Sequence, residues 1–218
     1  MTNSSRNPFL AACLLVFASL CHPCIAVAGV YEDLRWAVDD NNISDTTKLL
    51  AKGADPNTPD EQGNTLLMVA VRNKNTAMVN LLINAGAKLN LRNKHDETAI
   101  MLASYSGLGD IVEKLSIKGA EINHKGWNPL IYAATGGHAK IIPLLLDGGV
   151  QINSTSPNGT TALMMAVRGN HSDAVKVLLK NGADPNIRNE AGGTALKWAL
   201  AKKRDGIVEL LKSSGTKE

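Results

Sequence analysis

The chain has 218 residues, a formal net charge of +3 and 44% hydrophobic residues, proportions that are ordinary for a globular domain. Nucleic-acid binders carry a clustered basic surface and a much higher isoelectric point, so this charge balance excludes that class of protein. Aromatic residues make up only 4% of the chain. A core with so few rings is filled mainly by aliphatic side chains, which favours helices and repeats over an aromatic-rich β-sandwich.

The first 28 residues have the composition of an export signal. Arg6 precedes a run of apolar and small residues at 9–20, and Ala26-Val27-Ala28 supplies a small-x-small cleavage site. These are the three parts of a secretory signal peptide. We therefore predict a signal peptide at 1–28, cleavage after Ala28, and a mature chain of 29–218 that is periplasmic or secreted.

Other roles for this segment are less consistent with its sequence. A retained membrane anchor needs about 20 apolar residues, whereas the run at 9–20 has twelve. A lipoprotein needs a small residue before its modified cysteine, but Cys21 follows leucine and Cys24 follows proline. The C-x-x-C pattern at 21–24 precedes the cleavage site, as does Cys13, so the mature chain has no cysteine and no disulfide.

Residues 30–57 form the first predicted unit of the mature chain, with helices near Tyr31–Asp39 and Ser44–Ala51. This unit lacks the threonine motif of the units that follow, and it is rich in acidic residues. Because the terminal units of a repeat array need a polar outer face, we interpret residues 30–57 as an N-terminal cap.

Two series of residues recur through the rest of the chain. Asparagines are spaced 33, 33, 30 and 33 residues apart, each four residues after a glycine; they are Asn57, Asn90, Asn123, Asn153 and Asn186, after Gly53, Gly86, Gly119, Gly149 and Gly182. The second series begins the segments TLLMVA, TAIMLA, NPLIYA, TALMMA and TALKWA, at Thr65, Thr98, Asn128, Thr161 and Thr194. The side chains of the second series are good helix N-caps, and the glycines are suited to ending helices because they accept a positive φ.

The period and the second motif resemble those of ankyrin repeats, whose signature is 33 residues with T-P-L-H-x-A. The resemblance extends from residue 30 to about residue 215. It implies an all-α repeat solenoid of helix-turn-helix units joined by β-hairpin or loop fingers, as in exported bacterial ankyrin proteins. We expect six units, at 30–57, 58–90, 91–123, 124–153, 154–186 and 187–218, the last being the C-terminal cap.

The fourth unit departs from the pattern. Its three missing residues fall between Asn123 and Asn128, so we expect a shortened finger and intact helices. Pro143 stands in the second helix and is expected to bend it. The Gly136-Gly137 pair is expected to loosen the loop between the two helices.

In ankyrin arrays the finger tips and the inner-helix faces form a concave binding surface, so the resemblance implies a protein partner. The candidate partner-binding residues are Arg72, His95, Tyr105, His124, Lys125, Trp127 and Arg168, several of them of types that contribute strongly to interfaces. Trp127 either binds the partner or packs against the shortened finger. The resemblance places Tyr132 and Trp198 in the core, and the shared motif position of Met68, Met101 and Met164 indicates packing.

Catalytic and metal-binding motifs are missing from the sequence. The four histidines of the mature chain are spread over three units, and H-x-x-x-H, G-x-S-x-G and P-loop patterns do not occur. We therefore expect a non-catalytic protein-protein interaction module with no cofactor or metal, an unidentified protein partner, no nucleic acid, no membrane insertion after signal cleavage, and a monomeric state. Three alternatives stay open: an accessory or inhibitory factor for an envelope enzyme, an oxidative-stress support protein, and a secreted host-directed effector.

Overall fold

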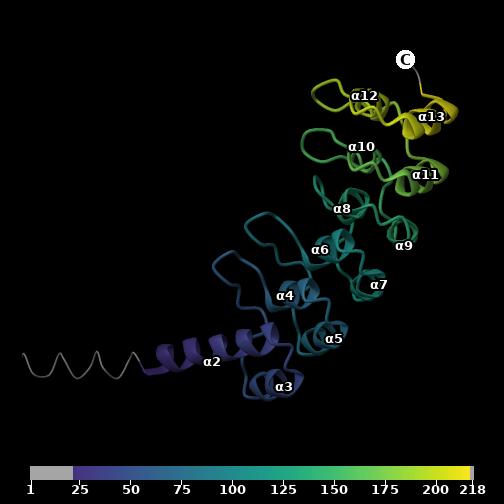
Figure 1. The fold of residues 1–218 in the computed structure, drawn as a ribbon. Coiled ribbons are helices and arrows are strands. Elements are labelled where there is room, and N and C mark those ends of the chain that lie inside the picture. The colour runs from purple at the N-terminus through teal and green to yellow at the C-terminus, as the bar shows by residue number, and fades with distance from the viewer. Residues whose placement is uncertain (1–21, 217–218) are drawn as a thin grey trace, which may run out of the picture.

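The computed structural model describes the backbone of residues 22–216 and the side chains of residues 29–216. Helices in this part of the chain pair into six antiparallel hairpins, which stack into a curved array (Figure 1). The first helices of the pairs are α2 (His22–Asp39), α4 (Leu66–Arg72), α6 (Ala99–Tyr105), α8 (Pro129–Gly136), α10 (Ala162–Arg168) and α12 (Ala195–Ala201). The second helices are α3 (Ile43–Ala51), α5 (Thr76–Asn84), α7 (Gly109–Ile117), α9 (Ile141–Asp147), α11 (Ser172–Lys180) and α13 (Asp205–Ser213).

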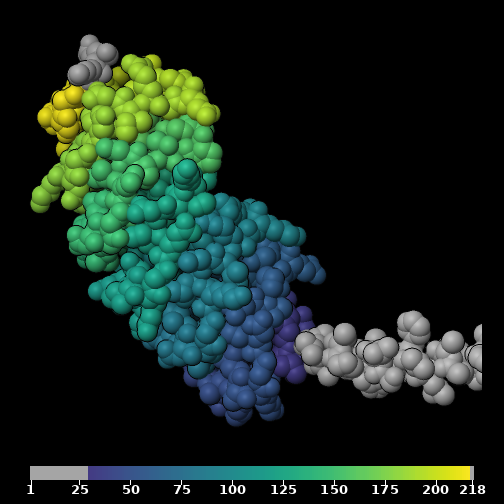
Figure 2. Space-filling view, turned by 180° about the vertical axis from the view of Figure 1, so that it is seen from behind, coloured from purple at the N-terminus to yellow at the C-terminus, as the bar shows by residue number. Residues whose placement is uncertain are grey.

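The first helices form one layer and the second helices form the other. Each first helix packs against the first helices of the neighbouring units, and the second helices do the same. The units follow one another in chain order along the length of the molecule (Figure 2). The predicted all-α repeat solenoid is therefore confirmed.

The predicted helix caps are confirmed at four of the five positions. The side-chain oxygens of Thr65, Asn128, Thr161 and Thr194 each accept a hydrogen bond from the backbone N–H three residues on. Thr98 is the exception, because its hydroxyl is buried and has no hydrogen-bond partner. The glycines of the first series end the second helices with φ between 86° and 93°, a region that residues with a Cβ rarely occupy.

The recurrent asparagines link each unit to the next. The side-chain oxygen of Asn57 accepts from the backbone N–H of Lys88 at 2.7 Å, and that of Asn90 accepts from Glu121 at 2.8 Å. Asn123 and Asn153 make the same bond to the following unit. The spacing of the asparagines thus follows from an inter-unit hydrogen bond that repeats with the array.

The core runs along the array between the two helix layers. It contains the leucine or isoleucine two residues after each cap, the alanine at the end of each motif, and the apolar residues of the second helices. Met68, Met101 and Met164 are each at most 1% exposed, in agreement with the prediction that they pack. Such burial drives the folding of repeat units that share one continuous core.

Pro143 lies at the start of its helix and not in the helix interior, where the sequence-based prediction placed it. Helix α9 begins at Ile141, later in its unit than the other second helices begin in theirs, so Pro143 lies in its first turn. A residue in the first turn has no intrahelical partner for its N–H, and proline is tolerated there. The proline therefore shortens the start of α9 and leaves the rest of the helix regular.

The prediction that Gly136 and Gly137 loosen their loop is also wrong. A Cβ on Gly136 would lie 2.5 Å from the carbonyl oxygen of Tyr105. His138 Nε2 bonds the same carbonyl at 2.8 Å, and His171 Nε2 bonds that of Thr135 at 3.0 Å. The glycines allow the histidine rings to reach the preceding unit, so they tighten the contact between units.

The two helices predicted for residues 30–57 correspond to α2 and α3. Residues 1–21 of the predicted signal peptide lie outside the described residues, and the predicted cleavage position after Ala28 falls within the span of α2. Among the helices of the described chain, none combines the length and the apolar character that crossing a membrane requires.

Candidate partner-binding surface

The fingers that connect the units are closed loops and not the β-hairpins that the resemblance offered as one form. The described residues contain no β-ladder, only a single bridge between Thr155 and Thr161. Each long finger is held by a polar side chain at its base that accepts backbone hydrogen bonds from its far side. Asp60, for example, accepts from the N–H groups of Gln62 at 2.8 Å and Asn64 at 2.7 Å.

Neighbouring long fingers are joined in two pairs. Lys94 N–H donates to the carbonyl of Gln62 at 2.9 Å, and Glu190 N–H donates to that of Asn158 at 3.0 Å. Within the described chain, residues 124–127 make no backbone hydrogen bond to the fingers on either side. The short fourth finger therefore interrupts the row of fingers (Figure 1).

A hollow of about 540 Å³ lies beside this interruption. Its lining comes from the fourth and fifth fingers: Asn123, His124, Lys125, Gly126, Gln151, Ser154, Thr155, Ser156 and Pro157. Lys125, one of the candidate partner-binding residues, is exposed there. The three-residue deletion thus leaves a recess with one free cation at its edge.

Three aromatic rings meet next to the short finger. Tyr105 and Trp127 are 52% and 37% exposed. Each packs edge-to-face on Tyr132, with ring centroids 6.3 and 6.0 Å away, the geometry that aromatic rings prefer. Trp127 therefore both packs and stays accessible, so the two roles that the sequence left open are compatible. We call Tyr105, Trp127 and Tyr132 the aromatic cluster.

The carboxylate of Glu97 lies beside the aromatic cluster. Tyr132 donates its hydroxyl to Glu97 at 3.1 Å, and Glu97 also accepts from the side-chain amide of Asn93 at 2.8 Å. Burial and then the charge of Glu97 raise the pKa of Tyr132. The phenol therefore stays protonated, and it anchors the cluster to the third finger.

Tyr132 and Trp198, both predicted to belong to the core, are each only half-buried, and Tyr132 lies on the inner-helix face. Trp198 packs partly against the core and also lines a hollow of about 300 Å³ with the predicted Arg168. In both cases the fifth motif residue meets the residue seven after the cap of the preceding unit. This pairing across a unit boundary is the signal that would have identified Tyr132, which the sequence-based list omits. Glu97, also omitted, is found only through its hydrogen bond with Tyr132.

The other predicted residues do not join the aromatic cluster. His124 lies 3.5 Å from Asp96 and 4.0 Å from Glu121, and Arg92 pairs with the same two acids at 3.3 and 3.6 Å. These contacts occupy His124 within the chain. His95 is exposed near the tip of the third finger, where its N–H donates to Asn93 at 2.9 Å.

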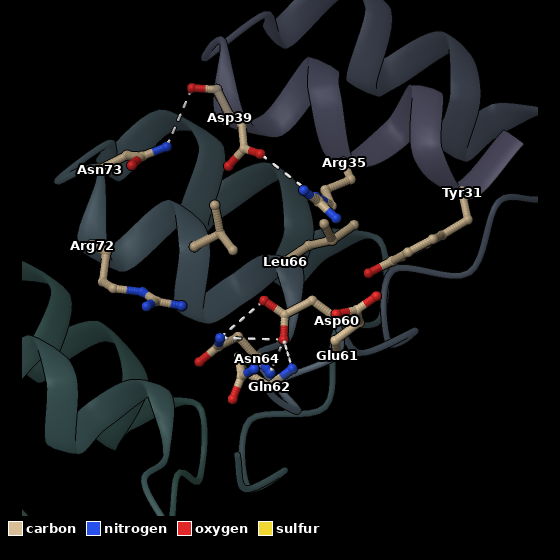
Figure 3. A pocket seen from close by; sticks show the side chains of 11 residues that line it. Tyr31, Arg35, Asp39, Asp60, Glu61, Gln62, Asn64, Leu66, Arg72 and Asn73 are labelled. Atoms are coloured by element: carbon tan, nitrogen blue, oxygen red, sulfur yellow. Dashed lines mark hydrogen bonds and ion pairs between the residues drawn. The ribbon is translucent and has the colours of Figure 1, made fainter. Parts of the chain in front are cut away.

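Arg72 lies at the N-terminal end of the surface, beside a polar hollow of about 570 Å³ between α2, α4 and the second finger (Figure 3). Burial of Asp60 opposes its charge, but hydrogen bonds from Asn64 and Gln62 hold the pKa of that carboxyl below its usual value. Burial, followed by the charge of Asp60, raises the pKa of Tyr31. This hollow is polar and charged, unlike the aromatic cluster.

The described side chains of this surface have features that suit binding. No group of three or more histidine, cysteine or acidic side chains among them is arranged to hold a metal ion. The strongest features are exposed rings, an adjoining recess and isolated charges, which are means of recognising another surface.

A family model for ankyrin repeats, in three copies, matches residues 34–125, 109–189 and 130–217. The overlapping matches together span 34–217. No curated protein matches the chain.

Proposed function

We propose that this chain, which belongs to the ankyrin-repeat family, is a non-catalytic protein-interaction module that binds a partner protein through its concave finger and inner-helix surface. The family indicates a role in protein-protein interaction. The aromatic cluster is the observation that carries the more specific proposal of where the partner binds.

The aromatic cluster has the properties of an interface hot spot. Tyrosine and tryptophan are enriched among the residues that contribute most to binding, because their rings bury a large area and lose little conformational freedom. The rings of Tyr105 and Trp127 are held in place by their edge-to-face contacts with Tyr132. A partner that covers them gains apolar contact without having to order flexible side chains.

The short fourth finger gives a partner access to these rings. Trp127 directly precedes the cap residue Asn128, at the base of this short finger. The recess lined by Lys125 and Pro157 adjoins the same finger. We therefore place the centre of the interface on the fourth unit, with Arg72 and Arg168 at its margins.

Affinity capture from an extract of the producing cell tests this surface. The bait proteins are the wild type, the double variant Tyr105→Ala/Trp127→Ala, and a control variant Ile117→Ala, whose side chain is 76% exposed on α7. The captured partner should be lost with the double variant and retained with the control. Identical partners for all three baits would reject the aromatic cluster as the interface, provided that circular dichroism shows each variant folded.

We also propose that the chain is exported, on the strength of the signal-like segment at 1–28. Fractionation of the producing cells, with mass spectrometry of the N-terminus, tests this location. The expected product begins at Gly29 and is found in the periplasm or the medium. A chain that keeps Met1 and stays in the cytoplasm would contradict the proposal.

A further inference from the structure

The two ends of the array expose residues that are stacking contacts everywhere else. The fifth motif position faces the preceding unit, as the contacts of Tyr132 with Tyr105 and Glu97 show. In the first unit this position is occupied by Trp36, which has no preceding unit against it among the described residues and is 61% exposed. It lines a hollow of about 440 Å³ on the outer side of α2 and α3.

Leu200 is the counterpart of Trp36 at the other end. The equivalent residues of the second to fifth units are Val71, Ser104, Ala134 and Val167, and all are fully buried. Val38, its equivalent in the first unit, is fully buried as well, whereas Leu200 is 54% exposed. This position is therefore covered by the following unit, and Leu200 is exposed because the described chain has no seventh unit.

The charges of the two end faces are opposite. At the N-terminal end, Asp45 occupies a position that is apolar and buried in all the other units, and Asp33 and Asp40 lie beside Trp36. Neither Asp33 nor Asp40 forms an ion pair within the described residues. The N-terminal hollow also contains Lys48, which pairs with Asp45, and Lys52.

At the C-terminal end the replacements are basic. Lys197 occupies the position of the buried Met68, Met101, Ile131 and Met164, and Lys212 that of the half-buried Leu146 and Leu179. The charged residues that line the N-terminal hollow are three acidic and two basic, namely Asp33, Asp40, Asp45, Lys48 and Lys52. The last helix pair, residues 195–216, contains two acidic and five basic residues. Each end face thus combines one large apolar side chain with an excess of charge that the other end would neutralise.

We propose that copies of this chain associate head to tail, the C-terminal end face of one copy packing on the N-terminal end face of the next. Leu200 of one copy then packs at Trp36 of the other, and the lysines at 197 and 212 face the aspartates around Trp36. The contact continues the stacking that already joins the units within one chain. It departs from the monomer expected from the sequence.

A second copy can fit because each end face exposes residues at the positions through which neighbouring units of the repeat stack. An end cap that only protects the array has a polar outer face, but each end here keeps an apolar residue at a stacking position. Because the two faces differ, the contact is heterologous, and such contacts form closed rings or open filaments. The concave surface takes no part in the contact, so this proposal stands or falls independently of the proposed function.

Sedimentation of the purified protein over a range of concentrations tests the proposal. The wild type should show an average mass that rises with concentration at low salt, and the rise should weaken at high salt because charges contribute. Trp36→Ala removes one face and Leu200→Ser removes the other. Both side chains are exposed, so each variant should keep the melting temperature of the wild type and stay monomeric.

Mixing the two variants is the decisive measurement. Trp36→Ala still has an intact C-terminal face and Leu200→Ser an intact N-terminal face, so an equimolar mixture should form a dimer and nothing larger. Tyr105→Ala, altered on the concave surface, should associate like the wild type. A wild type that remains monomeric throughout, or a mixture that stays monomeric while the wild type associates, would overturn the proposal.

Discussion

The hydroxyl of Tyr132 donates to Glu97 at 3.1 Å and thereby joins the first helix of the fourth unit to the finger of the third. The hydrogen-bonded carboxylate and phenol lie next to the two exposed rings of Tyr105 and Trp127. It also links the stability of the stack to the geometry of the proposed binding surface, since Tyr132 is the ring that both Tyr105 and Trp127 contact.

Tyr132→Phe removes this bond and keeps the ring. We expect a loss of roughly 1 kcal/mol in the free energy of unfolding at neutral pH, the usual contribution of one hydrogen bond. The pKa of Tyr132 is raised above the ordinary value of 10.0, by burial and then by Glu97. The stabilisation that depends on the protonated phenol is therefore fully present below about pH 10. It is lost as the pH rises from there through the higher pKa of the folded protein.

Urea unfolding of the wild type and of Tyr132→Phe at pH 7 and pH 11 checks this expectation. The difference between the two proteins should shrink at the higher pH. Tyr31, whose pKa is also raised, is present in both and cancels. A difference that is unchanged or larger at pH 11 would contradict the assignment.

Thr98 and Thr161 occupy equivalent positions but should respond differently to valine. Thr161 accepts the N–H of Met164 at 3.2 Å, so Thr161→Val should lower the stability by about 1 kcal/mol. The hydroxyl of Thr98 is buried without a partner, and replacing an unsatisfied polar group with an apolar one of the same shape is neutral or stabilising. Equal losses in thermal unfolding would show that Thr98 forms a cap in solution.

Gly136→Ala should destabilise the stack, because its Cβ would lie 2.5 Å from the carbonyl of Tyr105. Overpacking of this kind lowers the stability by about 1–3 kcal/mol. Gly206 in α13 is the matched control, because no atom lies within 4 Å of its added Cβ. Gly206→Ala should raise the melting temperature, since alanine favours a helix over glycine by roughly 0.5–1 kcal/mol. The same loss at both positions would rule out the close contact.

Asp60 should make the second finger sensitive to acid. Burial opposes ionisation, but the hydrogen bonds from Asn64 and Gln62 prevail and hold the pKa of Asp60 below the ordinary 3.8. Stability from this carboxylate is therefore present above pH 3.8 and is lost as the pH falls through the lower value of the folded protein. Asp60→Asn should thus destabilise the protein at pH 7 and make less difference near pH 2.

The control for this titration is Asp147→Asn, an exposed aspartate at the end of α9. Its replacement should leave the unfolding curve unchanged at both pH values. NMR titration of the Asp60 carboxyl gives the direct check, and a midpoint at or above 3.8 would refute the hydrogen-bonded arrangement.

The sequence by itself determined the repeat, its phase and most of its helix ends. A cap threonine or a helix-ending glycine acts on the backbone a few residues away, so the identity of that one residue is enough to predict where a helix begins or ends. The same is true of the deletion before Asn128, because the 25-residue spacing from each cap to the next asparagine is constant and locates it in a finger.

Only the tertiary structure decided what each unit presents to its neighbour. The contact of Tyr132 with Glu97 and the fit of His138 against Tyr105 depend on residues more than thirty positions apart in the sequence. Pro143 is accommodated in the first turn of α9 because that helix begins late, and Trp36 and Leu200 are exposed because no unit of the described chain packs against them. A side chain in a repeat array is core or surface according to what the adjacent unit places against it, and one motif position therefore has different roles in different units.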